Sequence, residues 1–253
     1  MPYLTVADAQ LYYQEHGTGD PLIYAHGFTG TGDGFCTNIL PLLGDGYRVI
    51  APDLRGHGRS TGAPETIGFD RFAADLVALL DHLDIERAHF VGHSGGAMAL
   101  LCLGIRHLPR ARTLTLIGGA HAWDEGARAQ IRALAAGWPT QPGWIDQKRS
   151  GHDAANGADH WRVLLDRLLA MADDPAVPPF QPADVGAITC QTLVVHGDHD
   201  PIYPVETAMA MYRAMPNAEL AVVPGAGHGT HSPTRPGRSS SRARPIRGRR
   251  PAS

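Results

Sequence analysis

Residues 88–98 read Ala-His-Phe-Val-Gly-His-Ser-Gly-Gly-Ala-Met, and this stretch decides the fold. The apolar residues up to Val91 predict a buried strand, and the apolar run 97–103 is long enough for a buried helix. Between them lies a Gly-x-Ser-x-Gly motif centred on Ser94. Glycines flank the serine of such a turn because a Cβ there would collide with the neighbouring strand and helix. We therefore predict a sharp strand–turn–helix unit that pushes the Ser94 hydroxyl out of the sheet.

The motif alone leaves two roles open for Ser94. A serine in a tight turn before a helix is more often a plain N-cap than a nucleophile. Short motifs of this kind also arise by chance, and the chain contains 30 glycines. The rest of the chain must therefore decide between the two roles.

Length and composition indicate an ordinary soluble globular protein. The 253 residues are 43% hydrophobic and 19% charged, and a chain of this length can bury one large core. The three cysteines, Cys36, Cys102 and Cys190, are odd in number and have no paired spacing, so we expect reduced thiols and a cytoplasmic location. No apolar run approaches membrane-spanning length, and the N-terminus lacks the features of a signal peptide. We expect no membrane contact.

Strands and helices alternate along most of the chain. Apolar runs predict a hairpin over 3–15 and strands at 21–25, 47–51, 88–91, 112–117, 192–196 and 220–223. A helix is predicted to follow the flexible stretch 29–34 and to run to about Leu43. Apolar residues at helical spacing predict a second helix over 69–83, and further helices are predicted over 97–103 and 205–215. This alternation predicts an α/β fold with a mostly parallel sheet, helices on both faces and right-handed crossovers.

One segment, residues 120–187, interrupts the alternation. It is helical in places, rich in Pro and Gly, and contains all four tryptophans of the chain, Trp123, Trp138, Trp144 and Trp161. We therefore divide the chain into a core formed by 1–119 and 188–231, an insertion at 120–187, and an Arg-, Pro- and Ser-rich tail at 232–253.

Polar residues follow the predicted strands where those strands end. In mostly parallel sheets the ligand site lies at the carboxyl ends of the strands. Five candidates stand at such ends: His26, Asp53, Ser94, Asp200 and His228. Because these ends meet at one edge of the sheet, we expect a functional site there.

Four further motifs make the chain resemble the α/β-hydrolase fold family, in which a Gly-x-Ser-x-Gly turn carries the nucleophile. The residues His26-Gly27-Phe28 resemble the oxyanion loop of that family. Residues 53–60 resemble its Asp-x-Arg-Gly-x-Gly-x-Ser loop, 196–200 its acid loop and 225–228 its histidine loop. The resemblance covers about residues 3–228. It implies a small serine hydrolase of the esterase or lactonase kind, with residues 120–187 as a helical lid inserted after the sixth strand.

The resemblance implies a catalytic triad, because Ser94, Asp200 and His228 follow one another in the family's order of nucleophile, acid and base. His228 would accept the Ser94 proton during attack, and Asp200 would orient the imidazole and stabilise its cation. By the same analogy, the backbone N–H groups of Phe28 and Gly95 would form the oxyanion hole. No cofactor is implied.

Each assignment has a competitor. Asp198 competes with Asp200, but the family places the acid three residues after the glycine, which favours Asp200. His231 competes with His228 by proximity alone. The acid loop 196–200 also holds metal-ligating side chain types, yet no partner cluster with suitable spacing supports a site, so we expect no metal.

The polar residues of the 53–60 loop have a simpler interpretation. Asp53, Arg55 and His57 are predicted to be structural, because a loop held by its own hydrogen bonds is commoner than a second catalytic centre.

A substrate pocket beside the predicted nucleophile has six candidate lining residues: Phe28, Met98, Trp123, Trp138, Trp144 and Trp161. Each of these side chains serves equally well to pack the insertion onto the core. The sequence therefore leaves the chemistry of the pocket open.

The tail departs from the family pattern. Residues 232–253 carry seven of the 22 basic residues, all Arg, and no acidic one, which leaves 15 basic against 25 acidic residues elsewhere. An amphipathic helix follows the histidine loop in the family, and this segment cannot form one. Basic runs bind nucleic acid, but arginine enrichment alone is not recognition. We expect no nucleic-acid partner, an altered or missing last helix, and a weaker anchor for His228.

These observations predict a serine hydrolase that cleaves a small ester, lactone or thioester through an acyl-enzyme. The same triad would serve a C–C hydrolase, an acyltransferase or a perhydrolase, so the fold does not settle the substrate. Dehalogenases and epoxide hydrolases are disfavoured because they need a carboxylate where Ser94 stands. An alternative of another class is a non-catalytic ligand-binding relative, or a product inactivated by its altered C-terminus. The oligomeric state is left open.

Overall fold

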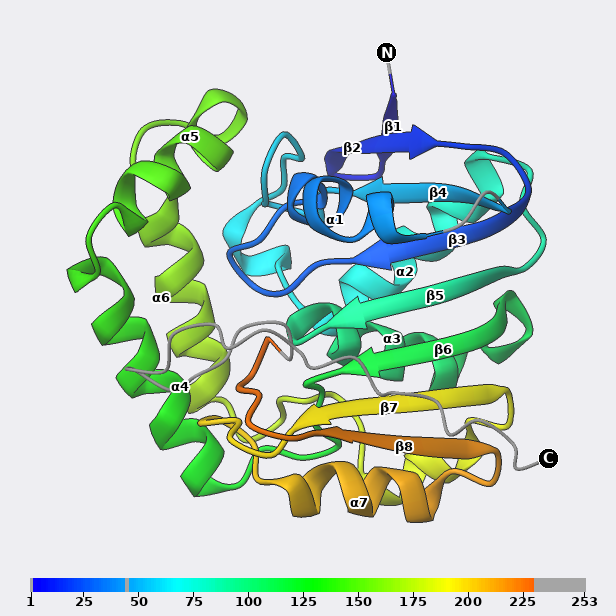
Figure 1. Ribbon diagram of the computed structural model, residues 1–253. Helices are drawn as coiled ribbons and strands as arrows, with labels where there is room; N and C mark the ends of the chain where they lie inside the picture. Colours follow the sequence, from blue (N-terminus) through cyan, green and yellow to red (C-terminus); the bar gives the residue numbers. More distant parts are fainter. Residues whose placement is uncertain (1, 44–45, 230–253) are drawn as a thin grey trace, which may run out of the picture.

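The computed structural model describes residues 2–43 and 46–229 of the chain (Figure 1). Its centre is a single sheet of eight strands, Tyr3–Val6 (β1), Ala9–His16 (β2), Asp20–Ala25 (β3), Tyr47–Pro52 (β4), Ala88–His93 (β5), Ala111–Ile117 (β6), Gln191–Gly197 (β7) and Ala218–Val223 (β8). The strand order is β1-β2-β4-β3-β5-β6-β7-β8. Among the strand pairs of the described residues, only those that involve β2 are antiparallel, which confirms the mostly parallel sheet.

The centre of the sheet is apolar because its strands meet in register there. Ile23 of β3 lies opposite both Ile50 of β4 and Phe90 of β5, and all three side chains are fully buried. Ala25 of β3 is paired with Gly92 of β5, and the parallel pairing continues from β5 to β6 and from β6 to β7. The carboxyl ends of β3 to β8 therefore lie along one edge of the sheet, on the left in Figure 1.

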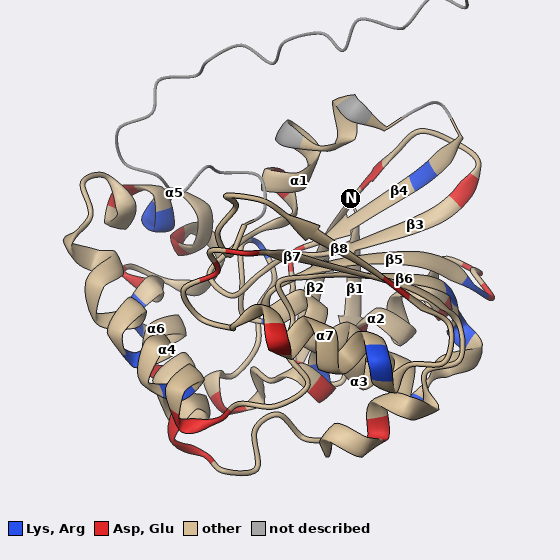
Figure 2. Ribbon diagram, turned by 60° about the horizontal axis from the view of Figure 1, so that its bottom comes forward, with Lys and Arg blue, Asp and Glu red and all other residues tan. Residues whose placement is uncertain are grey.

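Helices cover both faces of the sheet, as the alternation predicts. Helices Phe69–His82 (α2), Gly95–Arg106 (α3) and Val205–Ala214 (α7) lie on one face, and Gly32–Asn38 (α1) lies on the other (Figures 1 and 2). Helix α2 buries the apolar stripe that its spacing predicts, and α3 is buried over most of its length. These two helices pack against each other and form the main core with the sheet.

The inserted segment contributes three helices between β6 and β7: Glu125–Gly137 (α4), Trp144–Asn156 (α5) and His160–Asp173 (α6). Figure 1 shows them standing side by side across the edge of the sheet where the parallel strands end. The carboxyl ends of the strands therefore face a layer of helices that the core itself does not supply.

Two expectations about chain segments differ from the structure or fall outside it. The helix predicted to run to about Leu43 ends at Asn38, and a short 3₁₀ turn with Pro41 follows, because proline lacks the N–H that a continued helix needs. Helix α1 also begins within the predicted flexible stretch, at Gly32. The expectations for the tail and the last helix fall outside the described residues. No helix in the described ranges is both long and apolar enough to span a membrane.

Candidate active site

Ser94 stands at the tip of a sharp turn between β5 and α3. Its backbone has φ +51° and ψ −116°, a strained conformation for a residue with a Cβ. A Cβ on Gly92 would lie 2.8 Å from the backbone nitrogen of Ala97, and one on Gly96 would collide with the carbonyl oxygen of Ala25. The two glycines of the motif are thus required by close packing of strand and helix. The Ser94 side chain makes no capping hydrogen bond to α3, so it does not act as the N-cap that the motif left open.

Three side chains from distant parts of the sequence form a hydrogen-bonded series at this edge of the sheet. The Ser94 hydroxyl donates to Nε2 of His228 at 2.8 Å, and Nδ1 of His228 donates to Oδ2 of Asp200 at 2.7 Å. A carboxylate only accepts, so the Nδ1 of His228 carries the proton and its Nε2 is free to accept one. The arrangement has the geometry of a nucleophile, a base and an orienting acid.

Asp200 is held as a buried carboxylate. Its side chain is 0% exposed, and its Oδ1 accepts the backbone N–H groups of Ile202 and Tyr203 at 2.8 and 3.1 Å. Burial alone would raise the pKa of Asp200, but the hydrogen bonds from His228 and from the two backbone groups outweigh it and the pKa lies below its usual value. The rival Asp198 instead accepts the N–H of Gly225 at 2.6 Å and stabilises the loop.

The loop that carries His228 is anchored by contacts within the described chain. Nε2 of His93 donates to the His228 carbonyl oxygen at 3.2 Å, and the backbone N–H of His199 donates to the Ala226 carbonyl oxygen at 2.9 Å. Gly118 also packs tightly against it, since a Cβ there would lie 2.9 Å from the same His228 oxygen. These contacts hold the backbone of His228, and the part of the expectation that concerns the tail falls outside the described residues. His231 lies outside the described residues.

The backbones of Phe28 and Gly95 meet beside Ser94. A Cβ on Gly95 would lie only 3.2 Å from the backbone nitrogen of Phe28. Gly95 is also the first residue of α3, where the helix dipole favours negative charge. The two N–H groups expected to form an oxyanion hole are thus brought close to each other and to the serine.

A cavity of about 990 Å³ opens above Ser94 and His228. Its wall includes four of the six pocket candidates: Phe28, Met98, Trp123 and Trp138. Trp144 and Trp161 are not part of this wall, and their rings pack inside the insertion. Trp144 stacks on Trp138 at 6.2 Å between ring centroids and meets the edge of Trp161 at 5.8 Å. Both rings thus bury apolar surface between α4, α5 and α6 instead of facing the cavity.

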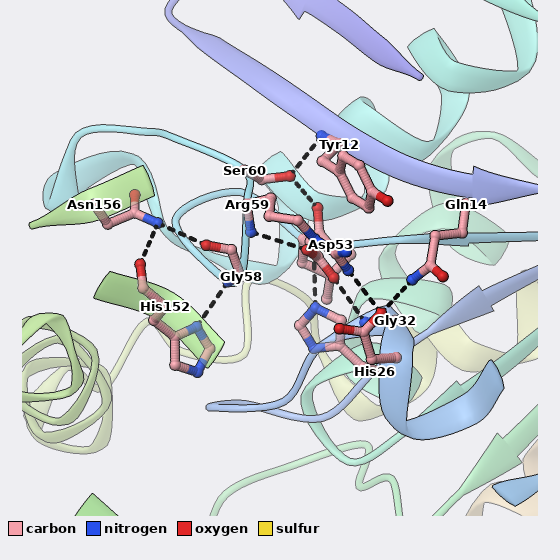
Figure 3. Close-up of polar contacts among 12 residues, drawn as sticks. Tyr12, Gln14, His26, Gly32, Asp53, Gly58, Arg59, Ser60, His152 and Asn156 are labelled. Atoms are coloured by element: carbon pink, nitrogen blue, oxygen red, sulfur yellow. Dashed lines mark hydrogen bonds and ion pairs between the residues drawn. The ribbon is translucent and has the colours of Figure 1, made fainter. Parts of the chain in front are cut away.

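The 53–60 loop is held as a structural element (Figure 3). Oδ1 of the fully buried Asp53 accepts the Gly32 N–H at 2.8 Å, and its Oδ2 accepts the Arg59 N–H at 2.9 Å. Nε2 of His26 accepts the Leu54 N–H at 2.9 Å. These contacts join the loop to the oxyanion-loop segment and give Asp53 and His26 supporting roles.

Arg55 and its carboxylate partners do not line the cavity above Ser94. The Arg55 side chain is 2% exposed and forms two hydrogen bonds with the carboxylate of Asp75, at 2.7 and 2.9 Å, and one with Asp8 at 2.6 Å. Burial would lower the pKa of Arg55, but these carboxylates raise it above its ordinary value, so the guanidinium stays charged.

Sequence reasoning missed three residues next to the oxyanion loop. Thr29 has φ +62°, and its carbonyl oxygen accepts hydrogen bonds from Lys148 and His152 of α5. Lys148 is the only lysine in the chain, which is the one signal in the sequence that sets it apart. Contacts between residues more than 100 positions apart leave no local pattern to read.

Comparison with known proteins identifies the family of the chain. The model of the Alpha/beta hydrolase family matches residues 22–238. The chain is 31% identical to a non-heme haloperoxidase of Rhodococcus erythropolis, over 90% of this chain and 93% of that protein. It is 30% identical to 3-oxoadipate enol-lactonase 2 of Acinetobacter baylyi, over 87% of each. Among solved structures, Est816, described as an N-acyl homoserine lactone degrading enzyme, has a TM-score of 0.73 and 26% identity, over 90% of this chain and 93% of that chain.

The chain belongs to the alpha/beta hydrolase family. Its relatives include hydrolases, which supports a hydrolase of this family.

Proposed function

We propose that the protein is a serine hydrolase that cleaves a small carboxylic ester, lactone or thioester through an acyl-enzyme on Ser94. The observation that carries the proposal is the series Ser94, His228 and Asp200, joined by hydrogen bonds of 2.8 and 2.7 Å beneath an open cavity. A serine hydroxyl is a weak nucleophile without such a base.

The geometry supports a two-step reaction. In the first step Ser94 Oγ attacks the substrate carbonyl carbon while His228 Nε2 takes its proton, and the N–H groups of Phe28 and Gly95 stabilise the developing oxyanion. The imidazolium, stabilised by Asp200, then protonates the leaving oxygen or sulfur, and the acyl group remains on the serine. In the second step water attacks the acyl-enzyme with His228 again as base, which releases the acid and restores the hydroxyl.

The cavity favours a substrate with an apolar acyl group or ring. Its volume of about 990 Å³ exceeds what a short acyl chain needs, and Met98, Trp123, Trp138 and Leu134 supply apolar wall. The likeness to an enol-lactonase and to a lactone-degrading enzyme supports testing lactones alongside open-chain esters.

A second candidate reaction is perhydrolysis, which the likeness to a non-heme haloperoxidase favours. Hydrogen peroxide would replace water in the second step, so that the acyl-enzyme yields a peroxy acid and free Ser94. The two reactions share the first step and differ only in which nucleophile reaches the acyl-enzyme.

The first experiment is labelling of the purified chain with a fluorophosphonate probe, read by intact mass and peptide mapping, with Ser94→Ala as the control. We expect one label, on Ser94, and none on the variant. Hydrolysis of p-nitrophenyl esters and of lactones would then define the acyl group, and the same esters with added peroxide would test perhydrolysis. A folded chain that is not labelled and hydrolyses no ester would refute the proposal and favour a ligand-binding relative.

A further inference from the structure

The segment that holds the Phe28 N–H is a strained turn. The N–H of Gly30 donates to the Gly27 carbonyl oxygen at 2.9 Å, which closes a four-residue turn with Phe28 and Thr29 in its centre. Thr29 has φ +62°, the sign that the third residue of a type II turn requires and that usually selects glycine. A β-branched residue at positive φ persists only where its surroundings hold it there. Something outside the turn must therefore hold Thr29.

Helix α5 of the insertion supplies the contacts that hold Thr29 in this conformation. The Thr29 carbonyl oxygen accepts a hydrogen bond from Nζ of Lys148 at 2.8 Å and another from Nε2–H of His152 at 3.2 Å. Thr29 is 6% exposed and His152 is 1% exposed, so water competes little for these bonds. Two donors from adjacent turns of one helix thus converge on a single carbonyl of the turn.

His152 also ties α5 to the 53–60 loop, as Figure 3 shows. Its Nδ1 accepts the Gly58 N–H at 2.7 Å, which leaves the proton on Nε2 for Thr29. Nδ2 of Asn156, one turn further along α5, donates to the Gly58 carbonyl oxygen at 3.0 Å. Nε2 of His160 on α6 donates to the Gly56 carbonyl oxygen at 2.8 Å. The insertion is thereby seated on the core at a defined position next to the turn.

We propose that helix α5 sets the oxyanion hole, with Lys148 and His152 as positioning residues that act through Thr29. When α5 is seated, the Thr29 carbonyl is held, the turn keeps its strained form and the Phe28 N–H stays beside Gly95. When α5 is displaced, Thr29 relaxes to negative φ, the turn changes type and the Phe28 backbone moves. Stabilisation of the transition state is therefore coupled to the seating of the inserted segment. This inference rests on the proposed serine hydrolase reaction.

The test compares Lys148→Met, His152→Phe and a matched control in steady-state ester hydrolysis. Loss of one oxyanion donor costs about 10²–10³ in rate, so a misplaced donor should lower kcat by roughly 10- to 100-fold in K148M and H152F. The KM for a neutral ester should stay within about twofold, because the donor acts mainly in the transition state. The affinity for a trifluoromethyl ketone, which forms an oxyanion on Ser94, should fall by the same factor as kcat. The K148R variant retains a donor and should lose less than K148M.

Arg149→Met is the matched control, because Arg149 is the next residue on α5 but pairs with Asp159 within the insertion. We expect wild-type kcat for R149M. A Thr29→Gly background adds a second readout that does not depend on how well the single variants fold. Glycine adopts positive φ freely, so K148M should cost only about twofold relative to T29G.

The outcomes separate the two proposals. If the folded wild type is not labelled by a fluorophosphonate and hydrolyses no ester, the proposed function fails and the inference with it. If the wild type hydrolyses esters but K148M and H152F retain its kcat, only the inference is overturned. A rise in KM confined to carboxylate-bearing esters, with kcat unchanged, would also overturn it, because Lys148 would then be a substrate contact. The inference would also be overturned if K148M lowered kcat by the same factor in the wild-type and T29G backgrounds.

Discussion

The free energy of unfolding should fall as the pH drops from 6.5 to 4, and His152 should account for about one proton of that dependence. The neutral ring is required, because Nδ1 accepts the Gly58 N–H while Nε2 donates to the Thr29 carbonyl oxygen. Burial lowers the pKa of His152 to about 4, against a smaller upward effect of the hydrogen bond to Thr29.

The magnitude follows from the difference between the folded and unfolded states. An unfolded histidine titrates near pH 6.5, so between pH 6.5 and 4 the unfolded chain binds a proton that the folded chain does not. The stability tied to neutral His152 is complete above pH 6.5 and is lost as the pH falls toward 4. The loss amounts to roughly 3 kcal/mol in total, or about 1.4 kcal/mol per pH unit within the window. Burial lowers the pKa of His26 and His57 as well, so they add to the same trend.

Urea unfolding followed by tryptophan fluorescence from pH 4.5 to 7.5 measures this slope. His152→Phe should be less stable than the wild type at pH 7.5 because two hydrogen bonds are lost. The free energy of unfolding of H152F should nevertheless change less steeply with pH. Between pH 4.5 and 6 its slope should be smaller than that of the wild type by the equivalent of about one bound proton. The control is His199→Phe, which replaces a side chain that is 46% exposed and should keep the wild-type slope. Parallel slopes for the wild type and H152F would refute the reasoning.

Four further single substitutions, one of them also combined with a second change, test the site and its supports. Ser94→Ala and His228→Ala should each abolish ester hydrolysis with little change in the circular dichroism spectrum; full activity in either would exclude the triad. Gly96→Ala should destabilise the fold by more than about 4 kcal/mol, because its Cβ collides with a backbone carbonyl of β3, and a wild-type melting temperature would contradict that. Arg55→Met should cost about 3–5 kcal/mol in urea unfolding by leaving Asp75 buried without its partner, and adding Asp75→Leu should recover most of the loss.

Much of the fold and part of the site follow from local patterns. The turn at Ser94 is predictable because two glycines must stand where a Cβ would meet the packed strand and helix. The stripe of α2 is predictable because helical spacing and burial coincide. Asp200 and His228 can be proposed because loops at strand ends have recognisable motifs, although their 2.7 Å hydrogen bond cannot be read from the chain.

The rest depends on contacts between distant residues. Trp144 and Trp161 lie in the same inserted segment as Trp123 and Trp138, and the sequence does not distinguish them. Residue type alone does not show which side of an inserted helix faces the cavity. The carbonyl of Thr29 is held by a hydrogen bond from a lysine 119 positions later, so no local stretch of sequence contains both partners. Such tertiary contacts decide how the oxyanion loop is shaped, and only coordinates reveal them.

The sequence distance between Ser94 and His228 makes the site a reporter of complete folding. The two residues are 134 positions apart, and His228 follows β8, the last strand that the structure describes. Parallel pairs such as β7 and β8 close long loops and so form slowly compared with local structure. A chain that has formed the Ser94 turn but not yet added β8 would have a native nucleophile without its base. Reactivity toward a fluorophosphonate during refolding would therefore follow docking of the final strand, and would lag behind the recovery of helix and of the central sheet.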